Sequence, residues 1–194
     1  MDRWIPPRRG ASRACPSAPP PTPQPGRVMV QLLRAEALSQ ALVGAAIPPV
    51  GAPGHDLAQL AAVALDGDDG PVAAALRAAS IPGRTSTRIL GGSRVAALVV
   101  EVRAPNESLE KAIAIVQSIL EKMDQATTEP LLAAAATAAA ARERDALIDP
   151  RRRLADLWLG SRPVAPRPRL DVFRGFVKTT FAASKLVVVE ARHP

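Results

Sequence analysis

A strand that runs directly into an amphipathic helix is the feature of this sequence that most constrains its fold. Residues 93–103 alternate with a period of two, and one face of the predicted strand is apolar: Ala96, Leu98, Val100 and Val102. Residues 106–123 then place apolar side chains along one stripe of a helix: Leu109, Ala112, Ile113, Val116, Leu120 and Met123. A strand followed by such a helix predicts a sheet with helices packed on one of its faces.

The second face of the same strand is also apolar over much of its length. Val95, Ala97 and Val99 share it, and charge enters only at Glu101 and Arg103. One layer of helices covers only one face of a sheet. We therefore expect the second face to be an exposed apolar patch unless another domain meets it.

The remaining segments complete the predicted layer pair. Gly91 and Gly92 indicate a hairpin between a strand over 84–90 and the strand over 93–103, because glycine adopts positive φ freely. Further strands are predicted over 27–33 and 186–189, and helices over 56–65, 71–80, 127–147, 151–159 and 171–181. Asp56, Asn106 and Asp171 are predicted N-caps, whereas residues 35–54 receive no assignment. The order predicts an α+β domain with a mainly antiparallel sheet and helices on one face.

The net charge of +7 is concentrated in two segments of the chain. Residues 1–26 hold four arginines against one aspartate, and residues 151–169 hold six against one, so the remainder is close to neutral. This distribution does not indicate a nucleic-acid-binding face, and a chain without tyrosine has little aromatic surface for base stacking. The run Arg151, Arg152 and Arg153 is a candidate electrostatic contact for an acidic partner.

The first 26 residues are rich in proline and arginine and predict a disordered leader, which leaves residues 27–194 as one domain. No apolar stretch follows the leader's arginines, so we recognise no signal peptide, and the cytoplasm is the default expectation. No apolar run approaches the roughly 18 residues that a membrane span needs.

The residue types that carry catalysis or bind metals are sparse. The two histidines, His55 and His193, lie far apart, and the zinc motif His-x-x-Glu-His is absent. The single cysteine, Cys15, falls in the leader, and the turn 66–70 lacks the spacing of a calcium loop. We therefore predict no catalytic residue, no metal site and no cofactor.

Several segments together resemble a known family. They are residues 93–123, the turn Gly67–Gly70, the pair Leu76 and Arg77, and the ending 170–190. From about residue 27 to residue 193, the chain is similar to the C-terminal, noncatalytic domain of the pitrilysin/insulinase-type zinc peptidases, as found in mitochondrial processing peptidase subunits. The resemblance implies a single half-domain, since the family's zinc motif belongs to its N-terminal domain.

The resemblance also implies a role for one residue. Arg77 matches an arginine with which the noncatalytic partner helps to hold substrate, which makes it a candidate peptide-binding residue. The match is incomplete, because Arg84 stands where the family has a tyrosine and Gly70-Pro71 replaces a Ser-Arg pair.

Three functional hypotheses follow. The leading one is a noncatalytic domain that acts as a structural or partner-binding half, its partner being a protein with the matching catalytic half or a second copy. The alternative is a subunit that completes a split zinc peptidase in trans and helps it to cleave peptides. The third is an electrostatic binder of an acidic partner or a nucleic acid.

Overall fold

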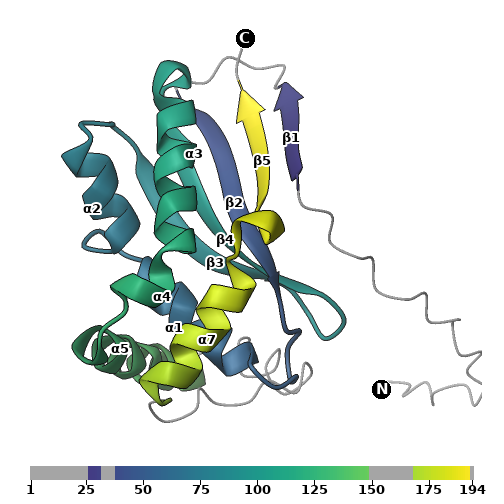
Figure 1. Ribbon diagram of the computed structural model, residues 1–194, viewed down its shortest axis with the longest axis vertical. Coiled ribbons are helices and arrows are strands. Elements are labelled where there is room, and N and C mark those ends of the chain that lie inside the picture. Colours follow the sequence, from purple (N-terminus) through teal and green to yellow (C-terminus); the bar gives the residue numbers. More distant parts are fainter. Residues whose placement is uncertain (1–25, 32–37, 149–167, 193–194) are drawn as a thin grey trace, which may run out of the picture.

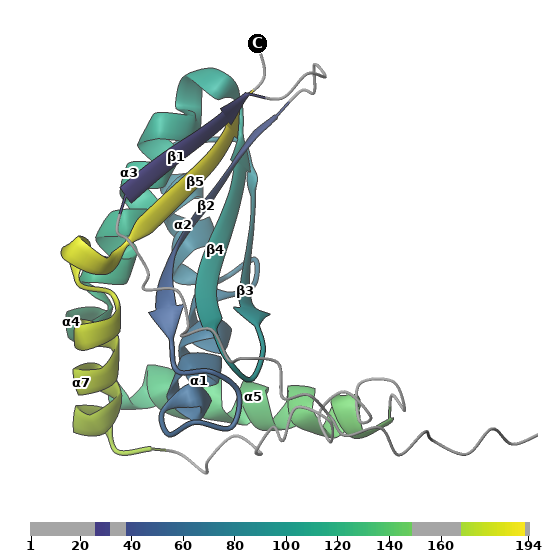
Figure 2. The ribbon, with the colours of Figure 1, turned by 90° about the vertical axis from the view of Figure 1, so that its right-hand side faces the viewer.

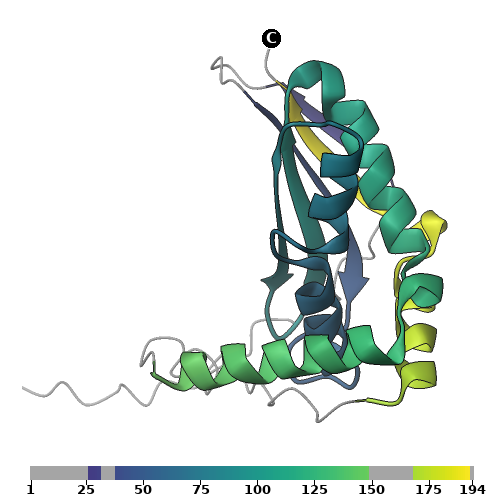
Figure 3. The ribbon, with the colours of Figure 1, turned by 90° about the vertical axis from the view of Figure 1, so that its left-hand side faces the viewer.

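The computed structural model describes residues 26–31, 38–148 and 168–192. Within them the chain forms one open sheet with helices packed on one face, as Figures 1, 2 and 3 show from three sides. The prediction of an α+β fold with a mainly antiparallel sheet is therefore confirmed. The leader, except Gly26, and the predicted helix over 151–159 lie outside the described residues.

The sheet has five strands in the order β1-β5-β2-β4-β3. The strands are β1 (Gly26–Gln31), β2 (Ser39–Ile47), β3 (Arg84–Gly91), β4 (Ala96–Ala104) and β5 (Val187–Arg192). All neighbouring pairs are antiparallel except β1 and β5, which run parallel at one edge. The predicted hairpin is confirmed, since Gly91 pairs with Ala96 and has a φ of 115°.

Strand β2 occupies the centre of the sheet, although the sequence pattern left its residues unassigned. It pairs with β4 on one side and β5 on the other, so pairing and burial override the weak strand preference of its alanines. Gly44 allows this packing, because a Cβ at that position would lie 2.1 Å from the carbonyl oxygen of Leu98. Residues Ala41, Val43, Ala45 and Ile47 of β2 are all buried against the helices.

The helices account for most of the remaining described chain. They are α1 (His55–Leu65), α2 (Pro71–Ala78), α3 (Asn106–Glu121), α4 (Met123–Ala126), α5 (Glu129–Ile148) and α7 (Leu170–Thr180), with a 3-10 turn at Ala183–Lys185. The helix predicted over 106–123 divides at Lys122 into α3 and α4. Among the described residues, no helix is long and apolar enough to cross a bilayer.

The three predicted N-caps are wrong. The capping positions of α1, α3 and α7 are Gly54, Pro105 and Arg169, and none of them makes a side-chain capping hydrogen bond. Asp56, Asn106 and Asp171 instead lie in the first turn of their helices, where the carboxylates of Asp56 and Asp171 still interact favourably with the helix dipole. The Asn106 side chain accepts a hydrogen bond from the Ser39 hydroxyl of β2, at 3.3 Å.

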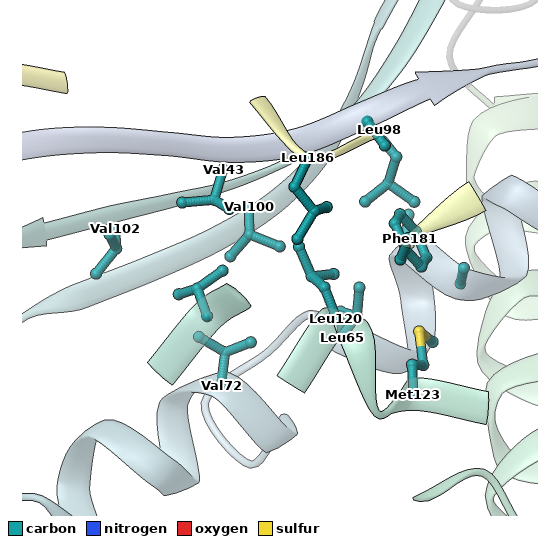
Figure 4. Close-up of a cluster of buried hydrophobic side chains, with 14 of the residues drawn as sticks. Val43, Leu65, Val72, Leu98, Val100, Val102, Leu120, Met123, Phe181 and Leu186 are labelled. Atoms are coloured by element: carbon teal, nitrogen blue, oxygen red, sulfur yellow. The ribbon is translucent and has the colours of Figure 1, made fainter. Parts of the chain in front are cut away.

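The core lies between the sheet and the helices. Figure 4 shows Val43, Val100 and Val102 of the sheet facing Val72 of α2 and the Leu120 region of α3. Phe181 and Met123 lie at the end of this cluster away from Val102, Leu186 lies between them and Val100, and all three are at least 95% buried. Each such side chain contributes about 1.5–3 kcal/mol relative to an exposed one, so this layer contact is the main source of stability.

Helix α5 crosses the end of the sheet and projects beyond it on the side away from the other helices (Figures 2 and 3). It packs against α1, and Arg142 reaches Asp66 at 2.9 Å. Asp66 also accepts a hydrogen bond from the Thr87 amide at 3.0 Å. One carboxylate therefore joins the turn after α1 to both β3 and α5.

Candidate interaction surface

The sheet face turned away from the helices lies outside the hydrophobic core of the described chain. We call it the open face, and strand register defines its residues, because directly paired residues point to the same side. They are Val28 and Val30 of β1, Val187, Val189 and Ala191 of β5, Gln40, Leu42, Gly44 and Ala46 of β2, Ala97, Val99, Glu101 and Arg103 of β4, and Arg84, Ser86, Arg88 and Leu90 of β3. No described helix covers this face in Figures 2 and 3.

One half of the open face is apolar. On β1, Val28 and Val30 are 54% and 46% exposed, and Val189 and Leu42 beside them are half-buried. Solvent-exposed apolar side chains that adjoin one another on a sheet are typical of a surface that meets another protein.

The other half of the open face is ionic and centres on Glu101 of β4. The Glu101 side chain is only 7% exposed, and its two oxygens receive Arg103 at 2.7 Å and Arg88 at 2.8 Å. Arg84 stands directly opposite Arg103 in the β3–β4 pair. This half therefore carries three arginines and one carboxylate that is already engaged by two of them.

The sequence pattern alone did not identify this ionic cluster, although a signal for it exists. Arg84, Ser86 and Arg88 alternate on the strand before the hairpin, and Glu101 and Arg103 alternate on the strand after it. Folding the two strands about Gly91 brings these residues to one face. The register of the predicted hairpin is therefore the sequence signal for this cluster.

A second ionic cluster lies on the helix side of the sheet and holds the edge strand. Glu190 of β5 is fully buried and accepts hydrogen bonds from Arg27 of β1 and from Arg192, the latter at 2.8 Å. Arg27 also reaches Glu110 of α3 at 2.6 Å. The hydrogen bond from Arg27 lowers the pKa of the Glu190 carboxyl, and the same bond raises the pKa of Arg27. Residues 163 positions apart make this contact, so local sequence carries no sign of it.

The predicted peptide-binding residue, Arg77, lies near the end of α2, and its side chain is 59% exposed. It donates to the Asp68 carbonyl oxygen and lies 3.7 Å from the Asp69 carboxylate. These contacts brace the turn between α1 and α2. A role for Arg77 in holding a peptide stays a prediction.

The other residues singled out in the sequence form no metal or catalytic site in the part of the chain that the structure describes. His55 is buried at the start of α1, and its Nδ1 lies 2.8 Å from the Pro48 carbonyl oxygen. No three of the described His, Cys, Asp and Glu side chains are grouped as metal ligands would be. Cys15, His193 and the predicted partner contacts Arg151, Arg152 and Arg153 lie outside the described residues.

Comparisons with known proteins reveal a relationship at the level of structure. No protein-family model matches this sequence, and no curated protein does. Among solved structures, the peptidase M16 inactive domain from Pseudomonas fluorescens superposes with a TM-score of 0.69 at 12% identity, over 91% of this chain and 45% of that one. The chain has the fold of an M16 peptidase domain.

Two further solved structures show how the length of this chain compares with that of similar structures. It matches a Helicobacter pylori protease with a TM-score of 0.68 at 13% identity, over 88% of this chain but 45% of that protease. It matches an inactive peptidase domain from Bordetella parapertussis with a TM-score of 0.69 at 16% identity, over 83% of this chain and 96% of that one. The chain thus spans about half the length of the first two structures. The likeness is to the M16 fold in general and does not single out the mitochondrial processing peptidase subunits.

Proposed function

We propose that this chain is a noncatalytic M16-type half-domain that binds a protein partner through its open face. The observation that carries the proposal is the apolar half of that face, which no element among the described residues covers. Covering it with a partner would remove apolar surface from water at about 25 cal/mol per Å². Structures that share the fold and are described as inactive peptidase domains support a noncatalytic role.

The geometry favours a binding role over a catalytic one. Glu101, the carboxylate of the open face, is occupied in a structural contact, since it holds Arg88 and Arg103. A general acid or base needs a titratable group free to meet a substrate, and a zinc-bound water needs a set of ligands. The described residues present apolar area and fixed charge instead, which suit recognition of a protein surface.

The test measures exposed apolar surface and partner binding on the same variants. We expect the full chain to enhance the fluorescence of a hydrophobic dye such as ANS. It should also associate, in sedimentation velocity, with a purified M16 chain that carries His-x-x-Glu-His. The double substitution Val28→Ser and Val30→Ser should reduce both signals, because it removes exposed methyl groups from the open face.

The matched control is Val172→Ser. Val172 lies on α7, on the helix side of the sheet, and at 49% exposure it resembles Val28 and Val30. It should leave dye binding and association unchanged. A stable monomer that neither binds the dye nor associates with the catalytic chain would refute the proposed function.

A further inference from the structure

The open face changes from apolar to basic in one direction, across the strands. Rows of paired residues run from β1 through β5, β2 and β4 to β3. One row reads Val28, Val189, Leu42, Glu101 and Ser86, and the next reads Val30, Ala191, Gln40, Arg103 and Arg84. A partner that lies along the strands would therefore rest on apolar side chains and have one flank beside arginines.

The ionic half of the open face carries an excess of positive charge. We call its three arginines, Arg84, Arg88 and Arg103, the arginine flank. Arg84, Arg88 and Arg103 face one carboxylate, Glu101, and both oxygens of that carboxylate are engaged. Arg84 and Arg103 are direct cross-strand neighbours, a placement that is unfavourable for two like charges. An added carboxylate between them would relieve this repulsion.

The two arginine-rich segments of this chain are poor sources of a carboxylate for Arg84 and Arg103, because both segments are strongly basic. Residues 1–26 carry four arginines against one aspartate, and residues 151–169 carry six arginines against one aspartate. Either segment would bring further positive charge to the arginine flank. A second copy stacked face to face would contribute the same arginines, together with a Glu101 that is already bound to two of them.

We infer that the open face recognises an acidic amphipathic segment of a different protein. Its apolar stripe would lie on β5 and β2, and Asp or Glu side chains along one edge would meet Arg84 and Arg103. This inference rests on the proposed function and adds the chemistry of the partner. Charge complementarity of this kind raises association rates and excludes partners that carry the opposite pattern.

Two synthetic peptides test the inference. Both have leucines at helical spacing, and one carries glutamates along one edge of the apolar stripe where the other carries lysines. In fluorescence anisotropy with the full chain, the glutamate peptide should bind at least about tenfold more tightly at low salt, and the difference should shrink in about 1 M salt. Equal affinity for the two peptides, or binding of neither, would overturn the inference. The dye-binding test decides the proposed function separately.

A charge-reversed variant locates the effect. Arg84→Glu should weaken binding of the glutamate peptide about tenfold and strengthen binding of the lysine peptide, since Arg84 is exposed at the edge strand. Lys178→Glu is the matched control, because it makes the same charge change on an exposed residue of α7, on the helix side. Circular dichroism melts confirm that both variants are folded. If the two variants weaken binding equally, net charge explains the preference and the arginine flank does not.

Discussion

Glu190 shows how one buried side chain can join parts of the chain that are distant in sequence. Its carboxylate lies on β5, and the arginines that bind it come from β1 and from β5 itself. Through Arg27 the same cluster reaches Glu110 of α3. A buried carboxylate is costly unless it is paired, so the fold depends on these arginines being in place.

Replacing Glu190 with glutamine should lower the free energy of unfolding at pH 7 by about 1.5–3 kcal/mol, the usual value of hydrogen bonds to charged groups. Because folding lowers the pKa of Glu190, its stabilisation is complete above the unfolded value of about 4.3. It is lost as the pH falls towards the folded value. Urea unfolding of both proteins between pH 7 and pH 3 should show the difference shrinking below about pH 4. A constant difference across this range would contradict the linkage.

The sequence predicts the turn residue Gly91 correctly but places three helix N-caps at the wrong residues. Gly91 was identified as a turn residue, and it has the positive φ that this requires. Asp56, Asn106 and Asp171 were assigned as N-caps, but the chain enters each helix one or two residues earlier. Residue type shows that a helix begins nearby, whereas the path of the preceding backbone decides which residue caps it.

At the scale of elements, β1 and β2 differ in the contacts that attach them to the rest of the sheet. Strand β2 is buried in the centre and is fixed by β4 and β5 on either side. Strand β1 lies at the edge, and all six of its residues are exposed. Backbone pairing with β5 and the ion pairs of Arg27 therefore provide most of its attachment.

Substituting Arg27 with alanine should loosen β1 without unfolding the sheet. Amides of β1 should exchange with deuterium about tenfold faster, which corresponds to about 1.4 kcal/mol of local stability. Exchange in β2 and β4 should stay unchanged, since neither strand pairs with β1. The matched control is Arg169→Ala, which removes an exposed arginine paired with Asp171 at the start of α7. Equal exchange of β1 in the two variants would show that Arg27 does not hold the strand.

At the scale of the whole molecule, the chain is a sheet with one covered and one open face. The pattern of residues 93–103 predicted an exposed apolar patch on the second face of this strand, but Val99 is buried and Ala97 is half-buried there, and the most exposed valines of the open face lie on β1 instead. The structure adds that the open face is apolar on β1, β5 and β2 and ionic on β4 and β3, where the arginine flank lies. Partner recognition is therefore expected to depend on both burial and charge.

The whole chain should not respond to zinc. We expect an excess of zinc, or of EDTA, to shift the melting temperature by no more than about 1 °C, because a ligand stabilises a fold only by binding it. This expectation follows from the proposed noncatalytic role. The Nδ1 atom of His55 is engaged with the Pro48 carbonyl oxygen, and the described residues hold no group of three possible metal ligands around it. Differential scanning fluorimetry measures the shift, with an M16 chain that carries His-x-x-Glu-His as the positive control. A clear rise in melting temperature with zinc would indicate a metal site and contradict a purely noncatalytic half.

The sequence by itself determined the local elements and the layer architecture. Periodicity predicted the β4–α3 unit, glycines predicted the hairpin, and the order of elements predicted an α+β fold, because these features depend on neighbours in the chain. Tertiary structure decided the placement of β2 and the Arg27–Glu190 contact. Each of these depends on strands that come together across the sheet, and local preference contains no information about such pairing.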